Sequence, residues 1–285
     1  MTNVSATLVG GMGNQMFVAA AAFALAQRLD TGVEFRTDSF RSDPNGRSFA
    51  LGAFPNVLAR STLAPPRRQL PMALQRRLDA HDPRVFTERS AAFDPRFDGI
   101  ASPVQLNGYF QSPRYFHDLP LPVDELFDVP GDNAVTSTIV SALGTDWFAM
   151  HVRRGDYMQS STAAYHGLCS DEYFLHGLEA LRRQSGRALP VALFTDSPEH
   201  ISSRLRSVAD LVVGPDPGRH ESIDLVAMSH ASGLVLSNSS YSWWAGYLRE
   251  RPDRVVVAPR PWFRHNDSAA SDLLLPHWLT LGAQA

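Results

Sequence analysis

Blocks of apolar and polar positions along the chain predict strands that alternate with helices. Residues 6–9 are largely apolar, a glycine-rich turn follows, and apolar residues then recur at helical spacing between positions 16 and 25. Residues 33–37 have the composition of a second strand. The chain therefore opens as an α/β unit. Asn14 is the predicted N-cap of the first helix, because its side chain can accept a hydrogen bond from a first-turn amide.

The second half of the chain repeats this alternation more regularly. Strands are predicted at 146–152, 190–196, 210–214, 233–239 and 254–263, and helices at 170–184, 198–208, 221–232 and 240–250. Ser170 is the expected cap of the first of these helices. Strands that alternate with helices indicate a parallel sheet covered on both faces.

The middle of the chain is less regular. Residues 38–104 are rich in proline and arginine, with a short helix expected near 70–80 and a strand that runs into a polar turn at 104–112. Prolines at 117–134 favour a linker. We expect two α/β domains, residues 1–125 and 126–285.

Composition excludes several classes of protein. The chain has 285 residues, a net charge of −3 and no lysine, so there is no basic surface for general nucleic-acid binding and no lysine nucleophile or P-loop cation. Cys169 is the single cysteine, which excludes an intrachain disulfide. No signal peptide and no apolar run of membrane-spanning length is visible. These features predict a cytoplasmic protein.

Four polar clusters follow predicted strands, where ligands bind in parallel α/β sheets. The first, "GGMGNQMF" (10–17), links a strand to a helix. Glycines let backbone amides approach a ligand, and a helix N-terminus favours an anion. The dinucleotide fingerprint is one alternative, with Glu34 as the ribose-binding acid, but Met16 occupies the third glycine position. A tight turn without a ligand is the other.

The second cluster, "HVRRGDYM" (151–158), places His151, Arg153, Arg154 and Asp156 after an apolar strand. Arginine forms bidentate hydrogen bonds to phosphate, and two neighbouring arginines point in different directions. One arginine can face a diphosphate while the other pairs with Asp156 or another acid. A surface turn with an internal ion pair is the alternative.

The third and fourth clusters are "SNSSYSWW" (237–244) and "FTDS" (194–197). The hydroxyls and amides of the serines can bind a phosphate at a helix N-terminus. Trp243 and Trp244 are expected to pack their helix against the sheet. Asp196 can contact a ribose or another sugar, or it can cap a helix.

These motifs resemble those of the bacterial α-1,2-fucosyltransferases, glycosyltransferase family 11. The three longer clusters occur in the family's order, together with "GYFQS" (108–112), "HGLCSDEYF" (166–174), "DLVAMS" (224–229) and "LPHWLTL" (275–281). They span nearly the whole chain. One departure is Ser197, which stands where a second acid often follows Asp196.

The resemblance implies a GT-B-like fold, two Rossmann-like α/β domains facing across a cleft, with the donor on the C-terminal half and the acceptor on the N-terminal half. It implies inverting transfer from GDP-L-fucose to the 2-hydroxyl of a β-galactoside, without an obligatory metal or a cofactor. The chain has no Asp-x-Asp pair that could hold a metal on the diphosphate.

The resemblance also implies roles for individual residues. Arg153, His151 and Asp156 are the predicted catalytic residues, with Arg153 in contact with the donor diphosphate. Asp224 would contact guanine. The remaining predicted donor-binding residues are Gly11, Gly13, Asn14, Gln15, Arg154, Asp196, Asn238, Ser239 and Ser240.

Three rival functions remain at this point: a transferase with another nucleotide sugar, a nicotinamide-dependent oxidoreductase that uses "GGMGNQ", and a non-catalytic sugar-nucleotide binder. The acceptor is expected to contact residues 38–115 and to include a lipid-linked glycan. The arginine-rich segment 65–77 has two alternatives, a solvated helix face or a peripheral contact with an anionic membrane.

Overall fold

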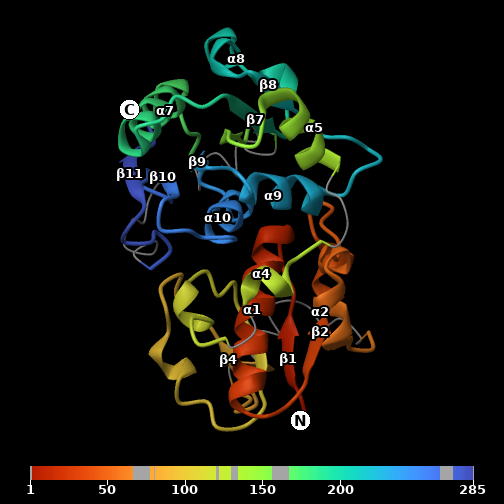
Figure 1. Cartoon of the computed structure of the whole chain (residues 1–285). Helices are drawn as coiled ribbons and strands as arrows, with labels where there is room; N and C mark the ends of the chain where they lie inside the picture. The colour runs from red at the N-terminus through yellow and green to blue at the C-terminus, as the bar shows by residue number, and fades with distance from the viewer. Residues whose placement is uncertain are drawn as a thin grey trace. The chain divides into compact units, whose positions relative to one another are not determined.

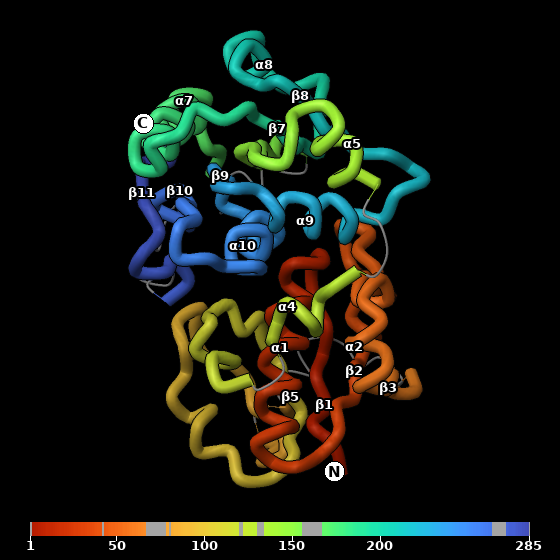
Figure 2. Tube along the Cα trace, viewed as in Figure 1, coloured from red at the N-terminus to blue at the C-terminus, as the bar shows by residue number. Residues whose placement is uncertain are grey.

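The computed structural model describes residues 2–66, 78–79, 81–119, 122–129, 134–155, 167–263 and 272–284. The chain forms two compact units, Met1–Asp128 and Val129–Ala285, and each is described by itself (Figures 1 and 2). Each unit contains one sheet, and all strand pairs in both sheets are parallel. The predicted α/β fold with two Rossmann-like halves is confirmed.

Unit 1 contains a five-stranded sheet in the order β3-β2-β1-β5-β4. Its strands are β1 (Val4–Thr7), β2 (Val33–Arg36), β3 (Ser61–Leu63), β4 (Val85–Thr87) and β5 (Gln105–Asn107). Its helices are α1 (Met12–Arg28), α2 (Pro55–Ala59) and α4 (Val123–Leu126), with short 3₁₀ helices η1 (Asp38–Ser42), η2 (Leu51–Ala53), η3 (Pro95–Phe97) and η4 (Pro113–Tyr115).

The long helix α1 packs on the central strand β1 of this sheet. Val4 and Ala6 are fully buried, as are Phe17 and Leu25 of the helix. Burial of this apolar face stabilises the helix more than its intrinsic propensity does. The strands β3 and β4 and the helix α2 were not predicted, because each is only three to five residues long. The predicted helix near 70–80 and most of segment 65–77 lie outside the described residues, so the membrane contact stays a prediction.

Unit 2 contains a six-stranded sheet in the order β11-β10-β9-β6-β7-β8. Its strands are β6 (Phe148–Val152), β7 (Val191–Thr195), β8 (Leu211–Val213), β9 (Gly233–Val235), β10 (Val255–Arg260) and β11 (Leu279–Gly282). Its helices are α5 (Ala134–Leu143), α7 (Asp171–Ser185), α8 (Ser203–Val208), α9 (Glu221–Ser229) and α10 (Ser240–Tyr247), with one 3₁₀ helix, η6 (Pro198–His200).

The sequence predicted most of these elements. Ser170 caps α7 as expected and accepts a hydrogen bond from the amide of Tyr173. Three expectations were wrong. The helix at 198–208 is divided into η6 and α8, α5 falls where no helix was expected, and β10 is followed by the further edge strand β11. The last two errors share a cause, since only Val135 and Ile139 of α5 are buried and no residue of β11 is, so neither element has the apolar pattern of a core element.

Side chains of β6 alternate between the two faces of the unit 2 sheet. Phe148, Met150 and Val152 belong to the core cluster that includes Phe174 and Leu178 of α7. The intervening His151 lies on the opposite face, because successive side chains of a strand point to opposite sides. The strand therefore carries a core on one face and a polar group on the other.

Candidate active site

The strand order of unit 2 creates a switch point between β6 and β9. From β6 the chain continues to β7 and β8 on one side, whereas β9 is followed by β10 and β11 on the other. The loops that leave β6 and β9 therefore diverge, and ligands of parallel α/β sheets bind in the crevice at the carboxyl ends of such strands. Both predicted clusters, 151–158 and 237–244, begin at this point.

His151 and Ser237 join the two loops. His151 Nδ1 lies 3.2 Å from Ser237 Oγ, and the imidazole centroid is 5.3 Å from the ring of Tyr241. His151 is only 5% exposed. Burial, together with the charge of Arg153, lowers the pKa of His151 to about 4 although Asp196 acts in the opposite direction. His151 is therefore a neutral imidazole at physiological pH and serves as a polar contact, not a cation.

Asp196, at the end of the neighbouring strand β7, orders the loop that contains Arg153. Its Oδ1 accepts hydrogen bonds from the amides of Arg154 (2.9 Å) and Gly155 (3.1 Å), and its Oδ2 lies 3.5 Å from Arg153 Nε. Burial alone would raise its pKa, but the charge of Arg153 and these two amides outweigh burial and lower it. Asp196 therefore stays ionised and holds the loop, a role that neither predicted alternative included.

Gly155 permits this close approach. A Cβ at position 155 would lie 2.6 Å from Asp196 Oδ2 and 3.3 Å from Ser197 Oγ. Any other residue would displace the carboxylate from the loop amides. The glycine of the "RRGD" motif is therefore explained by the aspartate after β7.

The two arginines of the motif occupy different environments. Arg154 is 9% exposed, and its guanidinium donates to the carbonyl of Cys169 (2.6 Å) and to Asp171 Oδ1 (2.9 Å) and lies 5.6 Å from the centroid of the Phe174 ring. These contacts attach it to the start of α7. Arg153 has a side chain that is 17% exposed, beside His151 at the switch point. The geometry thus favours Arg153 as the phosphate ligand, and donor binding by Arg154 stays a prediction.

Asn238 also has internal partners. Its Nδ2 lies within hydrogen-bond distance of the carbonyls of Gly167 (3.2 Å) and Trp262 (3.4 Å), and its Oδ1 accepts from Cys169 Sγ. The side chain is 3% exposed. Asn238 therefore connects the loop after β9 with residues 167–169, and it has this structural role whether or not it contacts a ligand.

The start of α10 lies at the end of β9. Ser239 is the N-cap residue, but its side chain makes no capping hydrogen bond, and Ser240 is the first helical residue. Amides in the first turn of a helix have no intrahelical acceptor, so they and these hydroxyls can bind an anion. Trp243 and Trp244 are fully buried, and Trp243 Nε1 donates to the carbonyl of Leu273. The buried indoles fix the helix in place.

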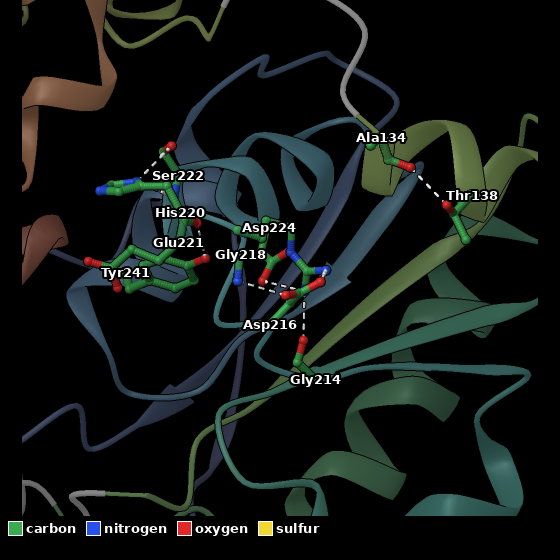
Figure 3. A network of polar contacts seen from close by, with 11 residues as sticks. Ala134, Thr138, Gly214, Asp216, Gly218, His220, Glu221, Ser222, Asp224 and Tyr241 are labelled. Carbon is green, nitrogen blue, oxygen red and sulfur yellow. Dashed lines mark hydrogen bonds and ion pairs between the residues drawn. The ribbon is translucent and has the colours of Figure 1, made fainter.

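A second polar network follows β8 (Figure 3). Arg219 Nε lies 2.8 Å from Asp224 Oδ1, and the same guanidinium donates to the carbonyl of Gly214 (2.6 Å). Burial raises the pKa of Asp224, while Arg219 acts against the increase. The hydroxyl of Tyr241 donates to the carbonyl of Glu221 (2.7 Å) and so connects α10 with α9. Sequence reasoning missed Arg219, although the turn "GPDPGR" that carries it is visible at 214–219.

In unit 1 the glycine-rich motif forms a turn before α1. Gly10 has φ +70°, and a Cβ there would lie 2.5 Å from Asn14 Nδ2. The helix begins at Met12 with Gly11 as its N-cap residue, and Gly13 lies in its first turn. The prediction of Asn14 as the N-cap residue was therefore wrong, because the glycines let the helix begin three residues earlier.

Asn14 and Gln15 both form internal hydrogen bonds. Asn14 Oδ1 accepts from Gln111 Nε2 (2.7 Å). Gln15 is fully buried: its Nε2 donates to the carbonyls of Gly10 (2.9 Å) and Ser48 (2.8 Å), and its Oε1 accepts from the amide of Ala50 (2.9 Å). Gln15 therefore connects the start of α1 to the loop before η2, and its predicted contact with a sugar hydroxyl stays a prediction.

Asp156 lies outside the described residues, so its catalytic role stays a prediction. Among the residues that the structure describes, no group of three or more His, Cys, Asp or Glu side chains is arranged to hold a metal ion. Within the same residues, no helix is long and apolar enough to cross a membrane.

A parallel α/β sheet with a helix N-terminus at its switch point is the arrangement in which Rossmann-like domains bind their ligands. The sequence model described as "Glycosyl transferase family 11" matches residues 94–282. The chain belongs to this family and is a glycosyltransferase. This membership decides against a nicotinamide-dependent oxidoreductase.

Two curated relatives from Escherichia coli extend along the whole chain. An alpha-1,2-colitosyltransferase is 25% identical over 99% of this chain and 99% of its own length. The O-antigen biosynthesis glycosyltransferase WbnK is 25% identical over 96% of this chain and 99% of its own length.

Solved structures with a similar arrangement are more distant. Arabidopsis thaliana FUT1 in complex with GDP has a TM-score of 0.49 at 13% identity, covering 92% of this chain and 71% of that one. The fucosyltransferase NodZ from Bradyrhizobium has a TM-score of 0.46 at 14% identity, covering 87% and 94%.

Proposed function

We propose that this protein is an inverting α-1,2-glycosyltransferase that moves L-fucose from GDP-β-L-fucose to the 2-hydroxyl of a β-galactoside. The observation that carries the proposal is the junction of β6 and β9, where Arg153, His151 and the start of α10 lie at neighbouring strand ends. This set offers cationic and N–H donors to a diphosphate. The family, and a relative named for α-1,2 transfer of a fucose-like sugar, support the linkage.

In the proposed reaction the acceptor oxygen attacks C1 of the fucosyl group on the face opposite to GDP. The bond between C1 and the β-phosphate oxygen breaks, GDP leaves with the electron pair, and the acceptor hydroxyl loses its proton. Negative charge grows on the β-phosphate as this bond breaks. Arg153 would stabilise that charge more in the transition state than in the ground state, which is the condition for catalysis.

The other residues would hold Arg153 and the donor in place. Asp196 fixes the backbone of the arginine loop through the amides of Arg154 and Gly155. Ser239 and Ser240 would bind phosphate oxygens with hydroxyl and amide groups. Asp224 would accept hydrogen bonds from guanine, with Arg219 holding its carboxylate.

The specific alternative is transfer of colitose, since one full-length relative carries that name. Colitose is fucose without the 3-hydroxyl, so the two donors differ by one polar group. A site that hydrogen-bonds this hydroxyl rejects the deoxy sugar strongly, whereas an apolar site discriminates weakly.

A donor panel tests the proposal. Release of the nucleoside diphosphate, GDP or ADP, would be followed with GDP-L-fucose, GDP-colitose, GDP-mannose and an ADP-linked heptose, in the presence of an array of β-galactosides. The product linkage would be assigned by NMR. We expect GDP-L-fucose to give the highest kcat/KM and an α-1,2 product. A higher kcat/KM with GDP-colitose would support the alternative, and no transfer from any donor would contradict both and favour a non-catalytic binder.

A further inference from the structure

A turn in unit 1 is held in one conformation from two sides. It comprises residues 108–112 and follows β5 at the carboxyl edge of the sheet. Glu88, which follows the neighbouring strand β4, accepts hydrogen bonds at Oε2 from the amides of Tyr109 (2.8 Å) and Phe110 (3.0 Å). A Cβ on Gly108 would lie 2.6 Å from Glu88 Cβ, so only glycine permits this approach.

Phe110 anchors the same turn from below. Its backbone has φ +52°, in the left-handed region that a side chain makes costly by roughly 1–2 kcal/mol. Its ring is fully buried, 5.1 Å from Tyr115 and 6.2 Å from Phe97 between centroids. Ring burial and the Glu88 hydrogen bonds offset the backbone strain. Strained residues persist where the surroundings fix them, and they concentrate at functional sites.

The residue that this turn presents to solvent is aromatic. Tyr109 is 49% exposed, although its neighbour Phe110 is fully buried. Two residues further on, Gln111 Nε2 donates to Asn14 Oδ1 (2.7 Å) and so joins the turn to the glycine-rich motif. Because β5 pairs directly with β1, the turns after both strands leave the same edge of the sheet. The same turn thus carries the exposed side chain of Tyr109 and, two residues on, the half-buried amide of Gln111 that pairs with Asn14.

We propose that Tyr109 is the stacking platform for the acceptor sugar, with Asn14 and Gln111 as its polar border. One face of a galactoside presents C–H groups whose hydrogens carry partial positive charge, and the face of an aromatic ring is negative. A tyrosine held by its own turn loses little conformational freedom when it binds. Gln111 Oε1 and Asn14 Nδ2 can pair with sugar hydroxyls. Glu88 is a positioning residue that acts through the turn. This inference rests on the proposed function.

Steady-state kinetics at saturating GDP-L-fucose, with methyl β-D-galactopyranoside as acceptor, tests the proposal. Tyr109→Ala should raise the acceptor KM about tenfold, Tyr109→Phe should stay within about twofold, and Tyr109→Leu should resemble the alanine variant because it lacks a ring face. The matched control is Leu63→Ala, an exposed apolar side chain on the edge strand β3 that is 53% exposed. All four variants alter exposed side chains, so unfolding temperatures should change little.

Glu88→Gln tests the positioning role. It keeps an acceptor oxygen but removes the charge, so the acceptor KM should rise while kcat at saturating acceptor and GDP affinity by calorimetry stay within about twofold. A residue that served only stability would lower the unfolding temperature and leave that KM unchanged.

An unchanged acceptor KM in Tyr109→Ala, with active wild type, would overturn the proposal, as would a tenfold loss of GDP affinity, which would place Tyr109 on the donor. Absence of transfer to any β-galactoside by the wild type would instead overturn the proposed function itself, and this inference with it.

Discussion

Arg153 and Arg154 are neighbours in the sequence, yet replacement by alanine should mainly lower turnover at Arg153 and mainly lower stability at Arg154. Arg153→Ala removes the cation at the switch point. A unit charge about 4 Å from a phosphate contributes on the order of 4 kcal/mol at an effective dielectric constant of 20. The share of this energy that is present only in the transition state is lost in Arg153→Ala, and kcat should fall a hundred- to a thousandfold.

Stability should change little in this variant. Arg153 has a partly exposed side chain, and its ion pair with Asp196 is a contact of 3.5 Å. Asp196 keeps the amide hydrogen bonds of Arg154 and Gly155, so the loop stays ordered. Arg153→Lys keeps the charge but loses the bidentate geometry and should recover little turnover.

Arg154→Ala should mainly affect the fold. It leaves the carbonyl of Cys169 and the carboxylate of Asp171 without their donor. The buried carbonyl of Cys169, left unsatisfied, costs about 1–3 kcal/mol, and loss of the ion pair with the partly exposed Asp171 adds to this cost. A total of about 3 kcal/mol lowers the unfolding temperature by roughly 6–12 °C in a unit of this size. At a temperature where the variant is folded, kcat should fall less than in Arg153→Ala.

The assay is GDP release under saturating donor and acceptor, paired with thermal unfolding of the same preparations. If Arg154→Ala lost turnover a hundredfold at normal stability while Arg153→Ala did not, Arg154 would be the phosphate ligand and Arg153 the structural residue. If both variants kept near-normal turnover, the loop after β6 would be a structural turn and the proposed mechanism would be wrong.

Four further outcomes are expected. Asp224→Asn should weaken GDP binding and narrow the preference for GDP over ADP in calorimetry, and an unchanged preference would place guanine recognition elsewhere. Transfer should stay within about twofold in excess EDTA, because in the proposed mechanism arginine and helix amides take the place of a metal; a tenfold loss restored by Mn²⁺ or Mg²⁺ would contradict this. Burial lowers the pKa of His151 from 6.5 to about 4 in the folded protein. Neutral His151 therefore contributes fully to stability above pH 6.5, and this contribution is lost as the pH falls from 6.5 toward 4. The difference in unfolding free energy between wild type and His151→Asn should shrink between pH 7 and pH 4.5. Finally, the two alternatives for segment 65–77 differ in vesicle co-sedimentation: binding that rises with the content of anionic lipid would support the membrane contact, and co-sedimentation independent of lipid charge would remove that hypothesis.

The sequence by itself determined the order of most elements and the position of the polar clusters. Hydrophobic periodicity depends on neighbours along the chain, so long elements such as α1 and α7 were predicted closely. Short edge elements such as β3, β4 and β11 were not, because a strand of three or four residues is stabilised by its partner strand more than by its own residues. The family motifs indicated a nucleotide-sugar transferase before any contact was known.

Only the tertiary structure decided what individual polar side chains do. The sequence did not reveal the partners of Arg154, because the carbonyl of Cys169 and the carboxylate of Asp171 lie 15 and 17 residues away along the chain. Neither predicted role of Asp196 included its hydrogen bonds to the arginine loop, since the amides that donate to it lie more than 40 residues earlier in the chain. Hydrogen bonding depends on distance and direction in space, and pairings between separate strand ends leave no periodic signal in the sequence.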